Sequence, residues 1–188
     1  MTSRTLAAAL AISLVAASLV AASPSAAQQT PPACGPPITL ETAKKVMAGA
    51  EAEAVKNNWP VFIVIVDSGS NIVMLHRFDN AQLGSLVLAK GKAQTALDFK
   101  LPTKALEDAI SAGGAGLRLT TLNNITPLEG GLPIVTDGKI VGAIGVSGVL
   151  SAQDAQIARA GIAARPPLVG YYRPRACLLF VHNGIKVA

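Results

Sequence analysis

Cysteine, histidine and aromatic residues are scarce in this chain of 188 residues, which has two Cys, two His and 4% aromatic residues. The histidines, His76 and His182, are far apart, and no group of His and Cys has the spacing of a zinc site. The cysteines, Cys34 and Cys177, form no Cys-x-x-Cys redox motif. The sequence therefore argues against a structural zinc centre and against a dithiol oxidoreductase.

Charged residues are also few, at 14% of the chain, and the formal net charge is +5. The basic residues are spread along the sequence, and no basic stripe with interleaved aromatic residues is present. We therefore expect no nucleic-acid partner. A mildly positive surface is better suited to a small ligand that carries carboxylates.

The N-terminus has the pattern of a secretory signal peptide, residues 1–27. Arg4 precedes an apolar run from Leu6 to Ala22, and small residues follow at Ser25 and Ala27. Cleavage after Ala27 predicts a periplasmic or secreted protein with no stable membrane span, and an uncleaved membrane anchor is the alternative. The net charge falls from +5 to +4, because Arg4 is the one charged residue removed.

The remaining 161 residues (188 minus 27) fit one domain. Residues 28–37 form a Pro-rich lead-in, because Pro31-Pro32 and Pro36-Pro37 forbid a helix. Residues 38–164 form the domain, and residues 165–188 form a C-terminal tail. Cys34 and Cys177 flank this domain, so in an oxidising compartment we predict that they form a disulfide, within one chain or between two subunits.

Helical spacing of apolar residues predicts four helices. Thr39 is a good N-cap for the first, Thr103 for the short third, and Ser151 with Asp154 for the last. Residues 111–128 are rich in Gly and Asn and predict a long loop. The helices are expected to run from Thr39 to about Asn57, from Gly84 to Phe99, from Thr103 to Ile110 and from Ser151 to Ala164.

Apolar and alternating segments predict two hairpins of β-strands. The run Val61 to Val66 is apolar throughout, which indicates a central strand covered on both faces. In the next strand, alternation places His76 on one face and Arg77 on the other. These elements predict an α+β fold, a mainly antiparallel sheet with helices on its faces. The remaining expected strands are Ile72 to Phe78, Leu132 to Thr136 and Lys139 to Ser147.

Several segments together resemble the GlcG/HbpS-like family of small haem-binding domains, some described as haem-degrading. The resemblance covers roughly Ile38 to Ala163. It implies a profilin-like or roadblock-like sandwich that assembles into homo-oligomers, and a haem cofactor that is bound non-covalently, since no Cys-x-x-Cys-His motif is present. The segments are Asp67-Ser68-Gly69, Leu75-His76-Arg77-Phe78-Asp79, Lys92-Ala93-x-Thr95-Ala96, Gly130-Gly131-Leu132-Pro133 and Gly142-Ala143-Ile144-Gly145-Val146-Ser147-Gly148.

Within this resemblance His76 is the candidate metal ligand, for a haem iron, and the alternative is a histidine satisfied by packing. Met74, Tyr171 and Tyr172 are other axial ligands that the chain offers. One family-wide axial position is not implied.

The candidate ligand-binding residues are expected to converge at the end of the second strand and the following helix. Arg77 and Asp79 would bind an acidic ligand group or pair with each other, since arginine binds a carboxylate through two parallel hydrogen bonds. Lys92 would pair with a haem propionate, or structurally with Asp79 or Glu129. The full set is His76, Arg77, Asp79, Lys92, Glu129, Gly130 and Gly131.

The sequence thus favours an exported small-molecule-binding protein, for haem or a related tetrapyrrole, acting as a homo-oligomer. One alternative is an enzyme that degrades haem or acts on a small hydroxy or keto acid. Another is a non-catalytic sensor or scaffold protein. Gly145-x-Ser147-Gly148 has neither a phosphate-loop nor a nucleophile-elbow pattern.

Overall fold

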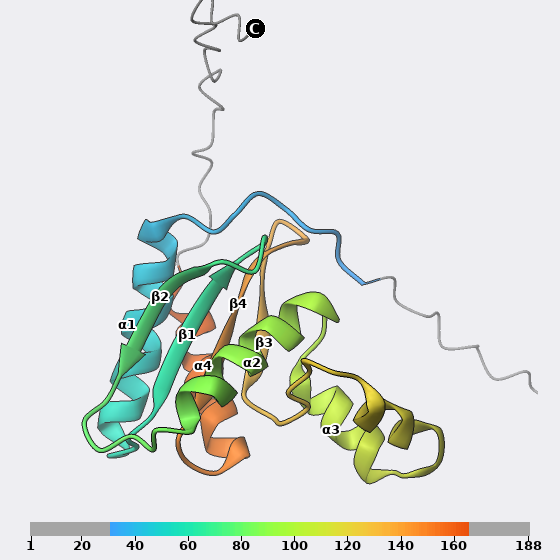
Figure 1. The fold of residues 1–188 in the computed structure, drawn as a ribbon. Helices are drawn as coiled ribbons and strands as arrows, with labels where there is room; N and C mark the ends of the chain where they lie inside the picture. The colour runs from blue at the N-terminus through green and yellow to red at the C-terminus, as the bar shows by residue number, and fades with distance from the viewer. Residues whose placement is uncertain (1–30, 166–188) are drawn as a thin grey trace, which may run out of the picture. The chain divides into compact units, whose positions relative to one another are not determined.

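The computed structural model describes residues 31–165, which form a four-stranded sheet with helices on both faces (Figure 1). All strand pairings in the sheet are antiparallel, so the predicted α+β class is confirmed. The elements are α1 (Leu40–Lys56), β1 (Phe62–Asp67), β2 (Ile72–Arg77), α2 (Ser85–Asp98), α3 (Thr103–Ser111), the 3₁₀ helix η1 (Gly114–Thr121), β3 (Gly131–Thr136), β4 (Lys139–Ser147) and α4 (Ser151–Ala163).

The sheet has the order β2-β1-β4-β3, so the two predicted hairpins lie side by side and β1 is internal. Phe62 of β1 is opposite Arg77 of β2 and opposite Ser147 of β4, while Gly131 of β3 is opposite Gly145. The end of β2, the end of β4 and the start of β3 therefore lie at one end of the sheet. β1 is buried on both faces, as its apolar run predicts.

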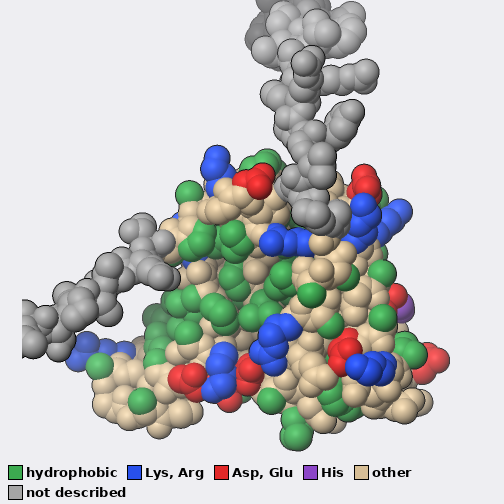
Figure 2. All heavy atoms as spheres, turned by 180° about the vertical axis from the view of Figure 1, so that it is seen from behind, with side chains coloured by type: hydrophobic (Ala, Val, Ile, Leu, Met, Phe, Trp, Pro, Cys, Tyr) green, Lys and Arg blue, Asp and Glu red, His purple; other side chains and the backbone are tan. Residues whose placement is uncertain are grey.

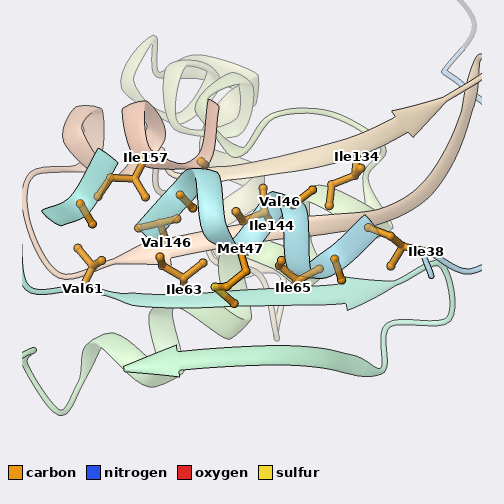
Figure 3. Close-up of a cluster of buried hydrophobic side chains, with 14 of the residues drawn as sticks. Ile38, Val46, Met47, Val61, Ile63, Ile65, Ile134, Ile144, Val146 and Ile157 are labelled. Carbon is orange, nitrogen blue, oxygen red and sulfur yellow. The ribbon is translucent and has the colours of Figure 1, made fainter. Parts of the chain in front are cut away.

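One face of the sheet packs against α1 and α4 (Figure 3). Alternate residues of β1 point into this layer, where they meet one stripe of α1 and the buried side of α4. The labelled side chains in Figure 3 converge between the helices and the sheet: Ile38, Val46, Met47, Val61, Ile63, Ile65, Ile134, Ile144, Val146 and Ile157.

The other face packs against α2, whose buried apolar residues are three alanines and one leucine, Ala89, Ala93, Ala96 and Leu97. Small residues let this helix approach the strands closely. A Cβ on Gly145 would lie 2.1 Å from the carbonyl oxygen of Ala89, so this position in β4 has room only for glycine. The close approach of α2 to the sheet is what buries the long side chain of Lys92, which is 1% exposed.

The observed helix ends differ from the expected ones in two instructive places. Thr39 caps α1 as predicted, accepting a hydrogen bond from Thr42 N at 3.2 Å. Thr103 is not a cap, because its hydroxyl turns to β3 and accepts from Gly131 N at 2.9 Å. Leu150 occupies the N-cap position of α4 in place of Ser151, and the segment expected to be a loop contains η1.

Several expectations fall on residues outside the described range. These are the signal peptide, Tyr171, Tyr172, Cys177 and His182, so the disulfide stays a prediction. Cys34 is exposed, and its segment forms a parallel bridge with Ile140 of β4. Within residues 31–165 no helix is long and apolar enough to cross a membrane.

Candidate functional site

The structure brings the predicted site residues together in two groups at one end of the sheet. His76, Arg77 and Asp79 lie at the end of edge strand β2. Lys92, Glu129, Gly130 and Gly131 lie at the opposite edge, where β3 begins. Two strands separate β2 from β3, which corresponds to roughly 14 Å at ordinary strand spacing.

His76 is held by a contact with α1. The Nδ1 atom of its ring meets the carboxylate of Glu51, and the ring packs against Phe78 with the centroids 5.4 Å apart. The His76 side chain remains 50% exposed. The ring is thus held by Glu51 and Phe78, while half of the side chain stays exposed.

A hollow of about 380 Å³ opens beside this group, between the end of α1 and the segment after β2. Two aromatic side chains, Trp59 and Phe78, contribute to its walls, and Asp79 lies at its margin. Both aromatic residues are half-buried and pack on the α1 face of the core. His76 does not itself line the hollow, but its ring packs against Phe78, which does.

Arg77 lies on the opposite face of β2, as the alternation predicts. Its guanidinium lies over the ring of Phe62 on the neighbouring strand, 5.8 Å from the ring centroid, which is a cation–π geometry. Among the described residues Arg77 forms no salt bridge with Asp79. Within residues 31–165 the guanidinium makes no hydrogen bond or ion pair with another side chain.

Lys92 forms a buried ion pair with a residue that the sequence did not indicate. Its Nζ donates to Asp154 Oδ2 at 2.7 Å and to the carbonyl oxygen of Val146 at 3.0 Å, and both side chains are 2% exposed. The expected partners, Asp79 and Glu129, do not pair with it. Burial raises the pKa of the Asp154 carboxyl above its ordinary value, and the Lys92 ammonium opposes that shift.

The double glycine at the start of β3 makes room for this pair. A Cβ on Gly130 would lie 2.9 Å from Lys92 Nζ, and one on Gly131 would lie 2.3 Å from the Lys92 carbonyl oxygen. Glu129 is turned the other way and lies 3.6 Å from Arg159. This group of residues joins α2, β3 and α4, and it has no free charge to offer a ligand.

Three contributors to the site were missed from the sequence. These are Glu51, Trp59 and, as the partner of Lys92, Asp154. No local pattern indicates these contacts, because Glu51 and His76 are 25 residues apart and Lys92 and Asp154 are 62 apart. Within residues 31–165 no cluster of three or more His, Cys, Asp or Glu is present that would hold a metal ion alone.

Comparison with known proteins identifies relatives over most of the domain. The family described as haem degrading protein HbpS-like matches residues 38–163. An uncharacterized 15.0 kDa protein of Citrobacter freundii is 38% identical over 127 residues, which is 66% of this chain and 89% of that protein. Protein GlcG of Escherichia coli K12 is 38% identical over 110 residues, 58% of this chain and 81% of GlcG.

A larger relative contains a similar domain. The corrinoid adenosyltransferase PduO of Salmonella typhimurium is 32% identical over 143 residues, which is 70% of this chain and 43% of PduO. This chain therefore spans less than half of that enzyme, and the similarity gives no ground for assigning it the whole enzyme's activity.

Solved structures agree with the sequence comparisons. The structure of HbpS has a TM-score of 0.63 and 32% identity, covering 69% of this chain and 90% of HbpS. The complex of PduOC with haem has a TM-score of 0.63 and 31% identity, covering 68% of this chain and 94% of PduOC. With the family match over residues 38–163, these likenesses show that the chain belongs to the GlcG/HbpS-like family.

Proposed function

We propose that this protein binds haem non-covalently at the end of β2, in the aromatic hollow beside His76. The observation that carries the proposal is the contact of His76 Nδ1 with Glu51, next to a hollow walled by Trp59 and Phe78. Two comparisons support the choice of ligand, since one similar structure is a haem complex and the family is described as haem-degrading.

The residues present fit a haem group. Histidines that bind metals usually use one ring nitrogen for the metal and hold the other against a carboxylate, which fixes the ring orientation. Glu51 supplies that carboxylate, leaving His76 Nε2 for the iron. Trp59 and Phe78 provide apolar contact for a porphyrin edge, and the bound iron would supply redox and oxygen chemistry.

Arg77 is suited to the acidic end of such a ligand. It is exposed at the end of β2 and pairs with no carboxylate among the described residues. Hydrogen bonds from arginine to carboxylates are charge-assisted and among the stronger ones in proteins. A propionate that reaches the α2 side of β2 would therefore find a partner in Arg77.

A haemin titration followed by the visible spectrum tests the proposal. The wild-type protein should give a Soret band that saturates at a fixed haem-to-chain ratio, and His76→Ala should shift that band and weaken binding. His182→Ala is the matched control, because it removes the other histidine of the sequence. A Soret band that is unchanged in folded His76→Ala would contradict ligation by His76.

Haem degradation is the second candidate, favoured by the description of the family as haem-degrading. Adding a reductant and oxygen to the haem-loaded protein separates the candidates. Binding alone preserves the Soret band over the time in which free haemin is stable. Degradation bleaches the band in the wild-type protein and not in His76→Ala.

Export and self-association complete the proposal. The pattern from Arg4 to Ala27 supports export to the periplasm or the medium. Exposed apolar side chains support a homo-oligomer, since Leu83 is 76% exposed and both Val87 and Leu150 are 72% exposed. Intact mass of the exported protein should show the loss of about 27 residues, and retention of Met1 would contradict cleavage.

A further inference from the structure

A second hollow, of about 450 Å³, opens on the α2 side of the sheet and is distinct from the one proposed for haem. It shares no lining residue with the hollow beside Trp59 and Phe78. It lies between the start of α2 and the segment that joins β4 to α4. The lining residues are Gln82, Ser85, Leu88, Ser147, Gly148, Val149, Leu150 and Gln153.

Two serines in this hollow have hydroxyls without a partner. Ser85 is 3% exposed and Ser147 is 4% exposed. Neither hydroxyl makes a hydrogen bond within residues 31–165, where every fully buried side-chain nitrogen and oxygen has one. Among the described residues both hydroxyls therefore stay in contact with the open hollow, where a ligand atom or water can serve as their partner.

The electrostatics of the hollow favour a single negative charge. None of its lining residues is ionisable, and the nearest buried charges, Lys92 and Asp154, neutralise each other. Helix α2 begins here with no acidic residue in its first turn and no side-chain cap. The dipole of α2 places at most roughly half a positive charge at this end, and no acidic side chain in the first turn offsets it, which suits a monoanion better than a phosphate dianion.

The hydrogen-bond donors that the hollow offers to a ligand are side-chain groups, because the first backbone amides of α2 are already bonded. Ser85 N and Leu86 N already bond to the carbonyl oxygens of Gln82 and Leu83, at 2.9 and 3.4 Å. Gln153 Oε1 accepts from Leu150 N at 3.2 Å, which leaves the amide NH₂ of Gln153 as a donor. Hydroxyl and amide donors around a partial positive charge match the two oxygens of a carboxylate.

We propose that this hollow is a subsite for a monocarboxylate, whose oxygens accept hydrogen bonds from the hydroxyls of Ser85 and Ser147. Leu88 and Leu150 offer apolar contact for the short carbon chain that bears it. The carboxylate belongs either to a free small acid or to a propionate side chain of haem. The site is argued from its own residues, and only its assignment to a haem propionate rests on the proposed haem binding.

Titration with propionate, followed by amide NMR of the protein expressed from the full-length chain, tests the subsite without haem. We expect saturable shifts of the signals of residues 147–150. Propionamide, a neutral isostere, should bind at least about tenfold more weakly, in line with the strength of hydrogen bonds to charged groups. The double variant Ser85→Ala/Ser147→Ala should lose a similar factor, whereas Ser111→Ala, an exposed serine at the end of α3, should behave as wild type.

A haemin titration of the same variants distinguishes the two sources. Weaker haemin binding in the double-serine variant, with or without shifts by free propionate, assigns the subsite to a haem propionate. Unchanged haemin binding with lost propionate binding assigns it to a free acid. Equal binding of propionamide and propionate, or a double-serine variant that binds both propionate and haemin like wild type, overturns the proposal.

Discussion

At one end of the sheet, charged residues are buried and paired at the β3 edge but exposed at the β2 edge. Near β3, Lys92 is buried and its charge is met by Asp154 and a backbone carbonyl. Along β2, His76 and Arg77 are exposed, and their contacts leave donor or acceptor atoms free. The comparison shows that a charged residue in a family-like motif can have a structural role. Burial and complete pairing distinguish such a residue from one whose hydrogen-bonding atoms are free to contact a ligand.

One face of the molecule carries charged side chains of both signs (Figure 2). On the face shown in Figure 2, acidic and basic side chains alternate around patches of hydrophobic residues, and no continuous basic stripe crosses the view. Local groups of residues, and not an overall field, must therefore select an acidic ligand.

The largest effect is expected from breaking the buried pair. Lys92→Met leaves the Asp154 carboxylate buried without a partner, and loss of one member of such a pair typically costs about 3 to 5 kcal/mol of unfolding free energy. Urea unfolding of the variant and the wild type measures the loss.

The double variant Lys92→Met/Asp154→Leu is the control for this prediction. It removes both charges and should recover most of the stability, because a well-packed apolar pair can replace a buried ion pair. If Lys92→Met unfolds at the same urea concentration as wild type, the pair does not have the structural role assigned to it.

A smaller loss is expected at the double glycine. In Gly131→Ala the new methyl group would meet the Lys92 carbonyl oxygen at 2.3 Å and Thr103 Cγ2 at 2.6 Å, so α2 and β3 must separate. Overpacking of this kind costs about 1 to 3 kcal/mol. Gly84→Ala is the matched control, since its Cβ meets nothing within 4 Å, and equal melting temperatures for the two variants would refute the close-packing explanation.

The smallest effect concerns the turn between β1 and β2, which fixes the register of the edge strand. Burial raises the pKa of the Asp67 carboxyl, but hydrogen bonds from Asn71 and from Gly69 N outweigh it and hold the pKa below its ordinary value. Asp67→Asn should cost about 1 kcal/mol at neutral pH.

The stability difference between the wild type and Asp67→Asn should depend on pH. A carboxyl whose pKa is lower in the folded state stabilises the fold fully above the ordinary pKa of about 4. That contribution disappears as the pH falls through the lowered pKa, so the wild type and Asp67→Asn should converge in acid. A stability difference that stays constant from neutral pH down to about 2 would contradict the role of the ionised carboxylate.

Local patterns were sufficient for most of the fold. Alternation in β2 placed His76 and Arg77 on opposite faces, and the apolar run of β1 identified an internal strand. Both patterns are local, because the face of the sheet to which each side chain points follows from its position along the strand. The role of Thr103 was not predictable in this way. Its hydroxyl bonds to β3 and not to its own helix, and that choice depends on the packing of α3.

The sequence indicated individual residues of the candidate site but not the contacts between them. Lys92 lies among the alanines of α2, which in retrospect is the signal of a buried lysine, but its partner lies 62 residues away and no spacing rule connects them. Glu51 likewise reaches His76 only after α1 packs on the sheet. The residues at the two edges come from separate segments of the family resemblance, and only the strand order reveals that they lie apart in space.

A haemin titration of Arg77→Ala and Glu129→Gln side by side tests the central claim, that the exposed edge along β2 carries the ligand and the β3 edge is scaffold. We predict that Arg77→Ala weakens haemin binding by about 1 to 3 kcal/mol, the range for a lost charged hydrogen bond, without unfolding the domain, and that Glu129→Gln leaves the affinity unchanged. Weakened binding in Glu129→Gln with wild-type affinity in Arg77→Ala would contradict the account and move the site to the β3 edge.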